Sequence, residues 1–129
     1  MKISISDLRA LCLNAGFDAV GFTAPSLPGS ARAGLGQFLE AGHHGDMDWM
    51  EKNQEVRADP AAIWPEAKSV IVLGMNYGPK ADPLQKLAQA EHGTISVYAL
   101  NRDYHDVIKG RLKQLCQQLH KRFGGDFRV

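Results

Sequence analysis

An apolar stripe with helical spacing runs through the last part of the chain. Its members follow steps of three, one and four residues and are Tyr104, Val107, Ile108, Leu112, Leu115, Cys116, Leu119 and Phe123. Asp103 is a candidate N-cap before the stripe, and Gly124 and Gly125 form a stop signal after it. The pattern predicts an amphipathic helix over residues 104–123 that buries its stripe, starting with Tyr104, against the rest of the chain.

Other segments predict a mixture of helices and strands. Residues 69–75 form a nearly continuous apolar run, which is typical of a central strand buried on both faces. Residues 17–24 and 94–100 are also predicted as strands, and residues 127–129 resemble the start of another. These patterns predict an α+β fold with a small central sheet flanked by helices.

Helical patterns and stop signals account for much of the remaining chain. We expect a helix over residues 5–15 that stops at Gly16, and a second one that Ser30 caps and that ends near Gly42. A short third helix is expected over residues 47–54, and a turn or a single helical turn over residues 60–65. Residues 76–93 are polar and carry little pattern.

Length and charge describe one ordinary globular domain. The chain has 129 residues, with 15 Lys and Arg against 14 Asp and Glu, so its formal net charge is +1. The chain has no excess of basic residues that would indicate binding to nucleic acid. Any RNA contact would therefore have to be local or come from residues outside this chain.

Cysteine usage and hydropathy predict a reduced, cytoplasmic protein. The two cysteines, Cys12 and Cys116, stand far apart at apolar positions of helical patterns, so we expect both in the core. Neither lies in a CxxC motif, which predicts that this chain alone binds neither an iron–sulfur cluster nor a cysteine-based zinc ion. No signal peptide is visible, and no apolar run approaches the length that crosses a membrane.

Asp103, Tyr104 and His105 place a carboxylate, a phenol and an imidazole together at the start of the predicted final helix. Histidine titrates near neutral pH, so such a group could position or protonate a polar substrate. A purely structural reading is also open. In that reading Asp103 is a helix cap, Tyr104 belongs to the buried stripe and His105 is an exposed residue of the first turn.

Two earlier segments carry further candidate residues. His43 and His44 lie in a loop framed by glycines, but adjacent side chains diverge in regular structure, so we predict no metal site there. Arg57 stands in a turn limited by Pro60, and a fixed guanidinium suits phosphate, carboxylate or amide oxygens. A surface arginine in a loop is the alternative reading.

Five segments in this order resemble the N-terminal domain of the epoxyqueuosine reductases, and the last is the most specific. They are residues 16–22, 42–50, 57–60, 67–72 and 98–105. The resemblance implies a cobalamin-binding α+β domain of nitroreductase-like fold. It also implies an oxidoreductase that reduces epoxyqueuosine in tRNA to queuosine with cobalamin and two 4Fe-4S clusters.

The resemblance also implies roles for single residues. Arg57 matches the family arginine that contacts cobalamin, and Asp103, Tyr104 and His105 match the motif on the substrate side of the pocket. The family's proton donor and cluster cysteines are expected beyond Val129. We therefore expect residues 1–129 to be a single N-terminal domain, truncated before the iron–sulfur domain and inactive alone. A non-catalytic α+β binding module and a stand-alone cobalamin-handling protein remain the alternatives.

Overall fold

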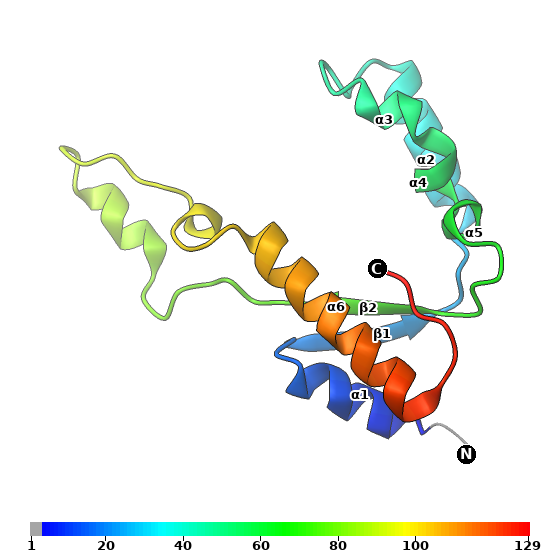
Figure 1. Cartoon of the computed structure of the whole chain (residues 1–129). Helices are drawn as coiled ribbons and strands as arrows, with labels where there is room; N and C mark the ends of the chain where they lie inside the picture. Colours follow the sequence, from blue (N-terminus) through cyan, green and yellow to red (C-terminus); the bar gives the residue numbers. More distant parts are fainter. Residues whose placement is uncertain (1–3) are drawn as a thin grey trace. The chain divides into compact units, whose positions relative to one another are not determined.

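The computed structural model describes residues 4–129 and confirms an α+β chain (Figure 1). The chain divides into two compact units, one made of residues up to Val20 together with Leu73–Val129, the other of Gly21–Val72. Each unit is described by itself below. Within residues 4–129, no helix combines the length and the apolar character needed to cross a membrane.

Two short strands, β1 (Ala19–Thr23) and β2 (Val70–Gly74), form an antiparallel sheet. The backbone N–H of Asp18 donates to the carbonyl oxygen of Gly74 over 2.8 Å at one end of the pair. Both strands were predicted, but the prediction of a central strand buried on both faces is wrong. Among the described residues β1 is the one strand beside β2, so the sheet has no interior position, and Val72 is 55% exposed.

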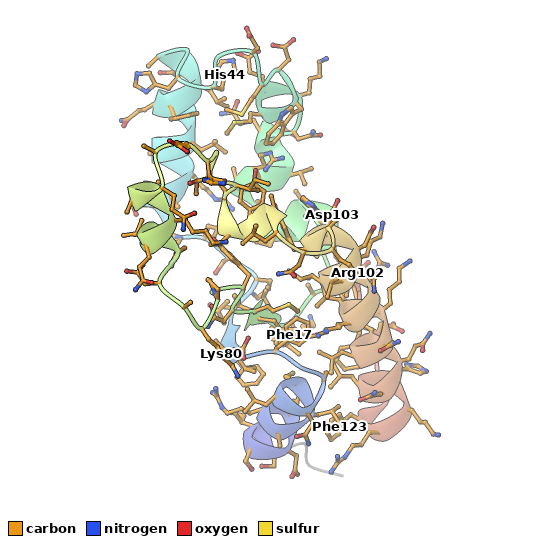
Figure 2. The ribbon with its side chains drawn as sticks, turned by 90° about the vertical axis from the view of Figure 1, so that its left-hand side faces the viewer. Phe17, His44, Lys80, Arg102, Asp103 and Phe123 are labelled. Carbon is orange, nitrogen blue, oxygen red and sulfur yellow. The ribbon has the colours of Figure 1, made fainter. Side chains whose placement is uncertain are left out.

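The first unit is built around two helices in contact, α1 (Ile5–Asn14) and α6 (Tyr104–Phe123). Its buried apolar side chains lie on or beside these helices and are Cys12, Phe17, Leu115 and Leu119. The last helix ends as predicted, since Gly124 adopts a φ of 68° and its N–H donates to the carbonyl oxygen of His120 over 2.9 Å. Figure 2 shows Asp103 at the start of α6 and Phe123 at its other end.

The segment between β2 and α6 contains two 3₁₀ helices, η1 (Pro83–Ala88) and η2 (Val97–Ala99). The predicted strand over residues 94–100 is therefore wrong. Ile95 and Tyr98 are 63% and 55% exposed, so the β-prone side chains of this segment gain little of the burial that stabilises a strand. Residues 127–129 are also not in a strand, contrary to the sequence prediction.

The second unit consists mainly of four helices: α2 (Gly29–Glu40), α3 (Trp49–Lys52), α4 (Gln54–Ala58) and α5 (Pro60–Ile63). Helix α4 contacts both α2 and α5. Pro28, not the predicted Ser30, occupies the N-cap of α2. The helix stops at Gly42, where φ is 68° and the N–H of His43 donates to the carbonyl oxygen of Phe38 over 3.1 Å.

An ion pair fastens α2 to the start of α5. Nη2 of Arg32 lies 2.5 Å from Oδ2 of Asp59, and Oδ1 of the same carboxylate accepts the N–H of Ala61 over 3.0 Å. Both contacts stabilise the ionised carboxylate, and the backbone hydrogen bond contributes most to the lowered pKa of Asp59. The carboxylate of Asp59 therefore both caps α5 and forms the ion pair with Arg32.

Candidate functional site

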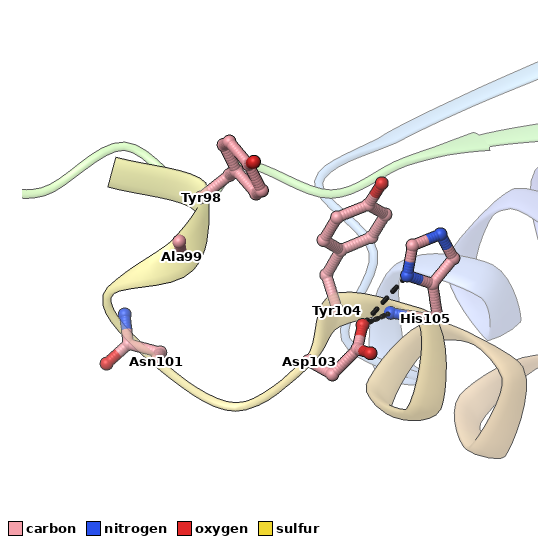
Figure 3. A pocket seen from close by; sticks show the side chains of 6 residues that line it. All are labelled: Tyr98, Ala99, Asn101, Asp103, Tyr104 and His105. Atoms are coloured by element: carbon pink, nitrogen blue, oxygen red, sulfur yellow. Dashed lines mark hydrogen bonds and ion pairs between the residues drawn. The ribbon is translucent and has the colours of Figure 1, made fainter. Parts of the chain in front are cut away.

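The first unit has an open hollow at the start of α6, with a volume of about 480 Å³. Six residues from η2, the following turn and the first turn of α6 line it: Tyr98, Ala99, Asn101, Asp103, Tyr104 and His105 (Figure 3). The three residues that the sequence singled out at 103–105 thus share one concave surface. Tyr98 and Asn101 join them, and sequence reasoning did not assign either to the site.

Asp103 is both the cap of α6 and the partner of an imidazole. Its Oδ1 accepts the backbone N–H of His105 over 2.9 Å and lies 2.8 Å from Nδ1 of the same residue. The backbone hydrogen bond, and after it the side-chain one, lowers the pKa of Asp103 from its usual value of 3.8. The carboxylate is therefore ionised at neutral pH. The prediction that Asp103 caps the helix is confirmed. The capping oxygen, Oδ1, also contacts the imidazole of His105.

Three rings follow one another along the wall of the hollow. Tyr104 stacks on His105, with ring centroids 4.1 Å apart and planes inclined by 26°. Tyr98 meets Tyr104 edge to face, at 6.3 Å and 80°. Such a row offers apolar ring faces beside a carboxylate and an imidazole, an arrangement suited to a planar ligand that also carries polar groups.

The burial of this row corrects one prediction and supports another. Tyr104 is 41% exposed, so it does not begin the buried stripe of α6. The half-buried positions of the helix begin at Val107, one turn further on. The side chain of His105 is 71% exposed, as expected for a residue off the stripe.

Arg57 belongs to the second unit and lies in α4, not in a turn as predicted. Its guanidinium carbon lies 4.3 Å from the centroid of the Trp49 ring, a cation–π contact. The Arg57 side chain is exposed, and no carboxylate in residues 4–129 forms an ion pair with it. The sequence analysis did not predict the contact between Trp49 and Arg57. The two residues lie on different short helices, so their spacing in the sequence does not indicate that they meet.

The two adjacent histidines diverge, as predicted. His43 packs edge to face on Phe38 at 5.6 Å, whereas Nε2 of His44 lies 3.1 Å from Oε1 of Glu51. The side chain of His44 is 11% exposed, and its Nδ1 is buried without a partner among the described residues. In the part of the chain that the structure describes, no three His, Cys, Asp or Glu side chains gather where they could hold a metal ion.

The two cysteines are free thiols in the first unit. Cys12 is fully buried, as expected, whereas Cys116 is only half-buried. Burial raises the pKa of both thiols, which keeps them in the unreactive neutral form. They act as apolar packing residues.

Comparison with known proteins identifies the kind of protein that carries this fold and site. The family model described as epoxyqueuosine reductase QueG, DUF1730, matches residues 57–129, a stretch that begins at Arg57 and includes the 103–105 motif. An epoxyqueuosine reductase of Pseudomonas aeruginosa is 41% identical over 110 residues, which is 84% of this chain and 30% of that protein. Those of Aliivibrio fischeri and Vibrio cholerae are 38% and 34% identical over 94% and 92% of this chain, and 34% and 32% of their own lengths.

These relatives are reductases by name, and they match the chain along most of its length. The chain belongs to the epoxyqueuosine reductase family. It spans about a third of the length of these curated relatives. No solved structure matches it significantly.

Proposed function

We propose that this chain is the cobalamin-binding N-terminal part of an epoxyqueuosine reductase, an oxidoreductase that converts epoxyqueuosine in tRNA to queuosine. The observation that carries the proposal is the family match over residues 57–129, which contains both segments with candidate site residues. The nitroreductase-like architecture belongs to the same proposal. So does a cytoplasmic location, which agrees with two cysteines that remain free thiols.

The surroundings of Arg57 fit a cobalamin contact. One face of its guanidinium is covered by Trp49 at 4.3 Å, while its N–H donors form no ion pair within residues 4–129. Such a group can donate in its own plane to the phosphate and amide oxygens that cobalamin carries at its periphery. Cobalamin brings its own cobalt, so the lack of a protein metal site in the described chain does not oppose binding. When bound, the cofactor would supply the redox chemistry.

The hollow of the first unit fits the substrate side. Tyr98 and Tyr104 offer ring faces and edges to a planar heterocycle, and Asn101, Asp103 and His105 add polar groups beside them. A modified nucleoside has this combination of a flat base and hydroxyl groups. The chemistry of the hollow therefore supports the assignment of residues 103–105 to substrate contacts.

The residues of this chain do not fit an iron–sulfur cluster. A cluster of this class needs four thiolates, and the sequence has two cysteines, both held as packing residues in the first unit. We therefore propose that the clusters are held by parts of the enzyme outside residues 1–129. The proton donor is placed there as well, on the family resemblance alone. The chain alone is expected to bind ligands without turning over substrate.

Titration with cob(II)alamin tests the proposal. The folded chain should bind, as followed by visible absorbance, and Arg57→Ala should weaken binding by about ten-fold, the loss expected when a charged hydrogen-bond donor is removed. Lys52→Ala is the matched control, because Lys52 is an exposed cation of the neighbouring helix α3 and should leave the affinity unchanged. A folded chain that shows no binding at millimolar cob(II)alamin would contradict the proposal.

A second candidate is favoured by one observation. The carboxylate of Asp103 caps α6, so a structural role alone could account for its place in the sequence. In that case the chain would be a non-catalytic α+β binding module. Such a module should show no preference for cobalamin over a corrin-free nucleotide, which the same titration measures with an adenine nucleotide as competitor.

A further inference from the structure

We infer that Asp103 is a positioning residue that holds His105 in its Nδ1–H form, so that Nε2 is the basic nitrogen offered to a hydroxyl-bearing ligand in the hollow. This inference rests on the proposed function, because it gives the substrate side a defined proton acceptor. It concerns the protonation pattern of one imidazole, which can be measured without cofactor or tRNA.

The proton on Nδ1 follows from the chemistry of its partner. Oδ1 of Asp103 lies 2.8 Å from Nδ1, and an ionised carboxylate can only accept hydrogen bonds. Nδ1 must therefore carry the hydrogen in this contact. A neutral imidazole has one N–H, so Nε2 is then left with a free lone pair.

The carboxylate is held in place by the fold. The same Oδ1 accepts the backbone N–H of His105 over 2.9 Å, which is the capping hydrogen bond of α6. Moving the carboxylate away from the imidazole would therefore also uncap a helix of 20 residues. The cap and the imidazole contact share one oxygen atom, so both depend on the same position of the carboxylate.

The ring is also restrained from its face. Tyr104 stacks on it with centroids 4.1 Å apart, so rotation of the imidazole would cost this contact as well as the hydrogen bond (Figure 3). Nε2 has no hydrogen-bond partner among residues 4–129, and the side chain is 71% exposed. The ring therefore combines a fixed plane, a fixed proton and an accessible acceptor.

This arrangement defines what His105 can do. A hydroxyl of a ligand bound in the hollow, which His105 lines, could donate to Nε2, which would orient the hydroxyl and accept its proton. The opposite form, with hydrogen on Nε2, would present a donor and repel that hydroxyl hydrogen. Asp103 thus selects acceptor over donor at Nε2 through its contact with Nδ1.

Nitrogen-15 NMR of the histidine-labelled chain tests the inference. At about pH 8, where histidines are ordinarily neutral, two-bond proton–nitrogen correlations distinguish Nδ1–H from Nε2–H. His105→Gln identifies the His105 signals among those of five histidines. His120 is an internal reference, because its Nδ1 lies 2.7 Å from the carbonyl oxygen of Gly125 and must also be the donor.

Three variants separate capping from imidazole positioning. Asp103→Ser keeps a capping oxygen but is too short and uncharged to hold Nδ1, so His105 should change to mainly Nε2–H while helix content stays the same. Asp103→Asn keeps both a cap and an acceptor, and should retain mainly Nδ1–H. Asp106→Ser, a change at the exposed acidic residue of the first turn, should leave the pattern unaltered.

The outcomes are separate from those of the cobalamin titration. A wild-type His105 that is mainly Nε2–H would overturn the inference, as would an Nδ1–H form that persists in Asp103→Ser. Either result can occur in a chain that binds cobalamin, and then the proposed function stands alone. An Nδ1–H form that depends on Asp103 supports the inference even if cobalamin does not bind.

Discussion

The guanidinium of Arg111 donates a hydrogen bond to the carbonyl oxygen of Gly16 over 2.5 Å, between positions 95 residues apart in the chain. The same nitrogen lies 3.9 Å from the sulfur of Met75, just after β2. One half-buried side chain of α6 therefore reaches the end of α1 and the end of the sheet. These contacts connect three segments of the first unit, which also contains the hollow.

Loss of this link should destabilise the chain. Arg111→Met keeps much of the apolar stem but removes the donor, so we expect the free energy of unfolding to fall by about 1.5–3 kcal/mol, the usual range for a hydrogen bond that involves a charged group. Denaturant midpoints measure the change. Lys109→Met, on the exposed side of the same helix, should change stability by less than about 0.5 kcal/mol. Equal effects of the two changes would show that the link is not stabilising.

Two glycines of the first unit should respond in opposite ways to alanine. Gly16 has a φ of +91°, and a Cβ there would lie 2.7 Å from Nη1 of Arg111, so Gly16→Ala should destabilise by more than about 1 kcal/mol. Gly110 lies within α6, and a Cβ there would meet nothing within 4 Å, so Gly110→Ala should stabilise by about 0.5–1 kcal/mol. Thermal unfolding followed by circular dichroism compares them. Stabilisation by Gly16→Ala would refute the backbone assignment.

Helices were predicted more closely than strands because their signals are local. The bounds of α6 follow from Asp103, the apolar stripe and Gly124, which all lie within one segment. A strand also depends on what lies beside it. Residues 94–100 have β-prone side chains but no neighbouring strand in the described structure, so they form a 3₁₀ turn instead. Likewise, the apolar run of β2 could not reveal that Val72 is exposed.

The residues of the apolar stripe of α6 should contribute unequally to the free energy of unfolding. Leu115 is 2% exposed, so Leu115→Ala should lower the free energy of unfolding by about 2–5 kcal/mol. Tyr104 is 41% exposed and packs on the exposed rings of Tyr98 and His105, so Tyr104→Ala should cost about 1 kcal/mol, despite the larger side chain removed. Urea denaturation of both variants measures the difference. A Tyr104→Ala variant as unstable as Leu115→Ala would restore the prediction of a buried tyrosine.

The site was predictable where its parts are close in sequence. Asp103 and His105 are two residues apart, so the cap and the imidazole contact follow from one turn of backbone. Trp49 and Arg57, which are in contact, lie on α3 and α4, and the two helices are separated by a break at Asn53. No spacing rule for a single helix describes such a break.

The cap at Asp103 should give the chain a measurable acid dependence. The folded state lowers the pKa of this carboxyl below its usual value of 3.8, so its contribution to stability is complete above that value and is lost as the pH falls through the lower, folded pKa. Asp103→Asn keeps a cap without a titrating group. The difference in stability between wild type and Asp103→Asn should therefore shrink as the pH falls below about pH 4, as measured by urea denaturation at each pH. A difference independent of pH down to pH 2 would mean that Asp103 is not held as an ionised cap.

Trp49 should affect cofactor binding only through Arg57. The ring covers one face of the guanidinium at 4.3 Å, and an exposed cation–π contact contributes about 0.5–1 kcal/mol. If this contact orients Arg57 toward cobalamin, Trp49→Leu should weaken cob(II)alamin binding by about two- to five-fold, whereas Trp49→Phe, which keeps an aromatic face, should weaken it less. In the Arg57→Ala background, Trp49→Leu should have no further effect, because the group that it orients is gone. Absorbance titrations of the four variants and the wild type give the coupling between the two residues. Independent, additive losses would mean that Trp49 contacts the cofactor itself or supports the fold, and that its contact with Arg57 plays no part in binding.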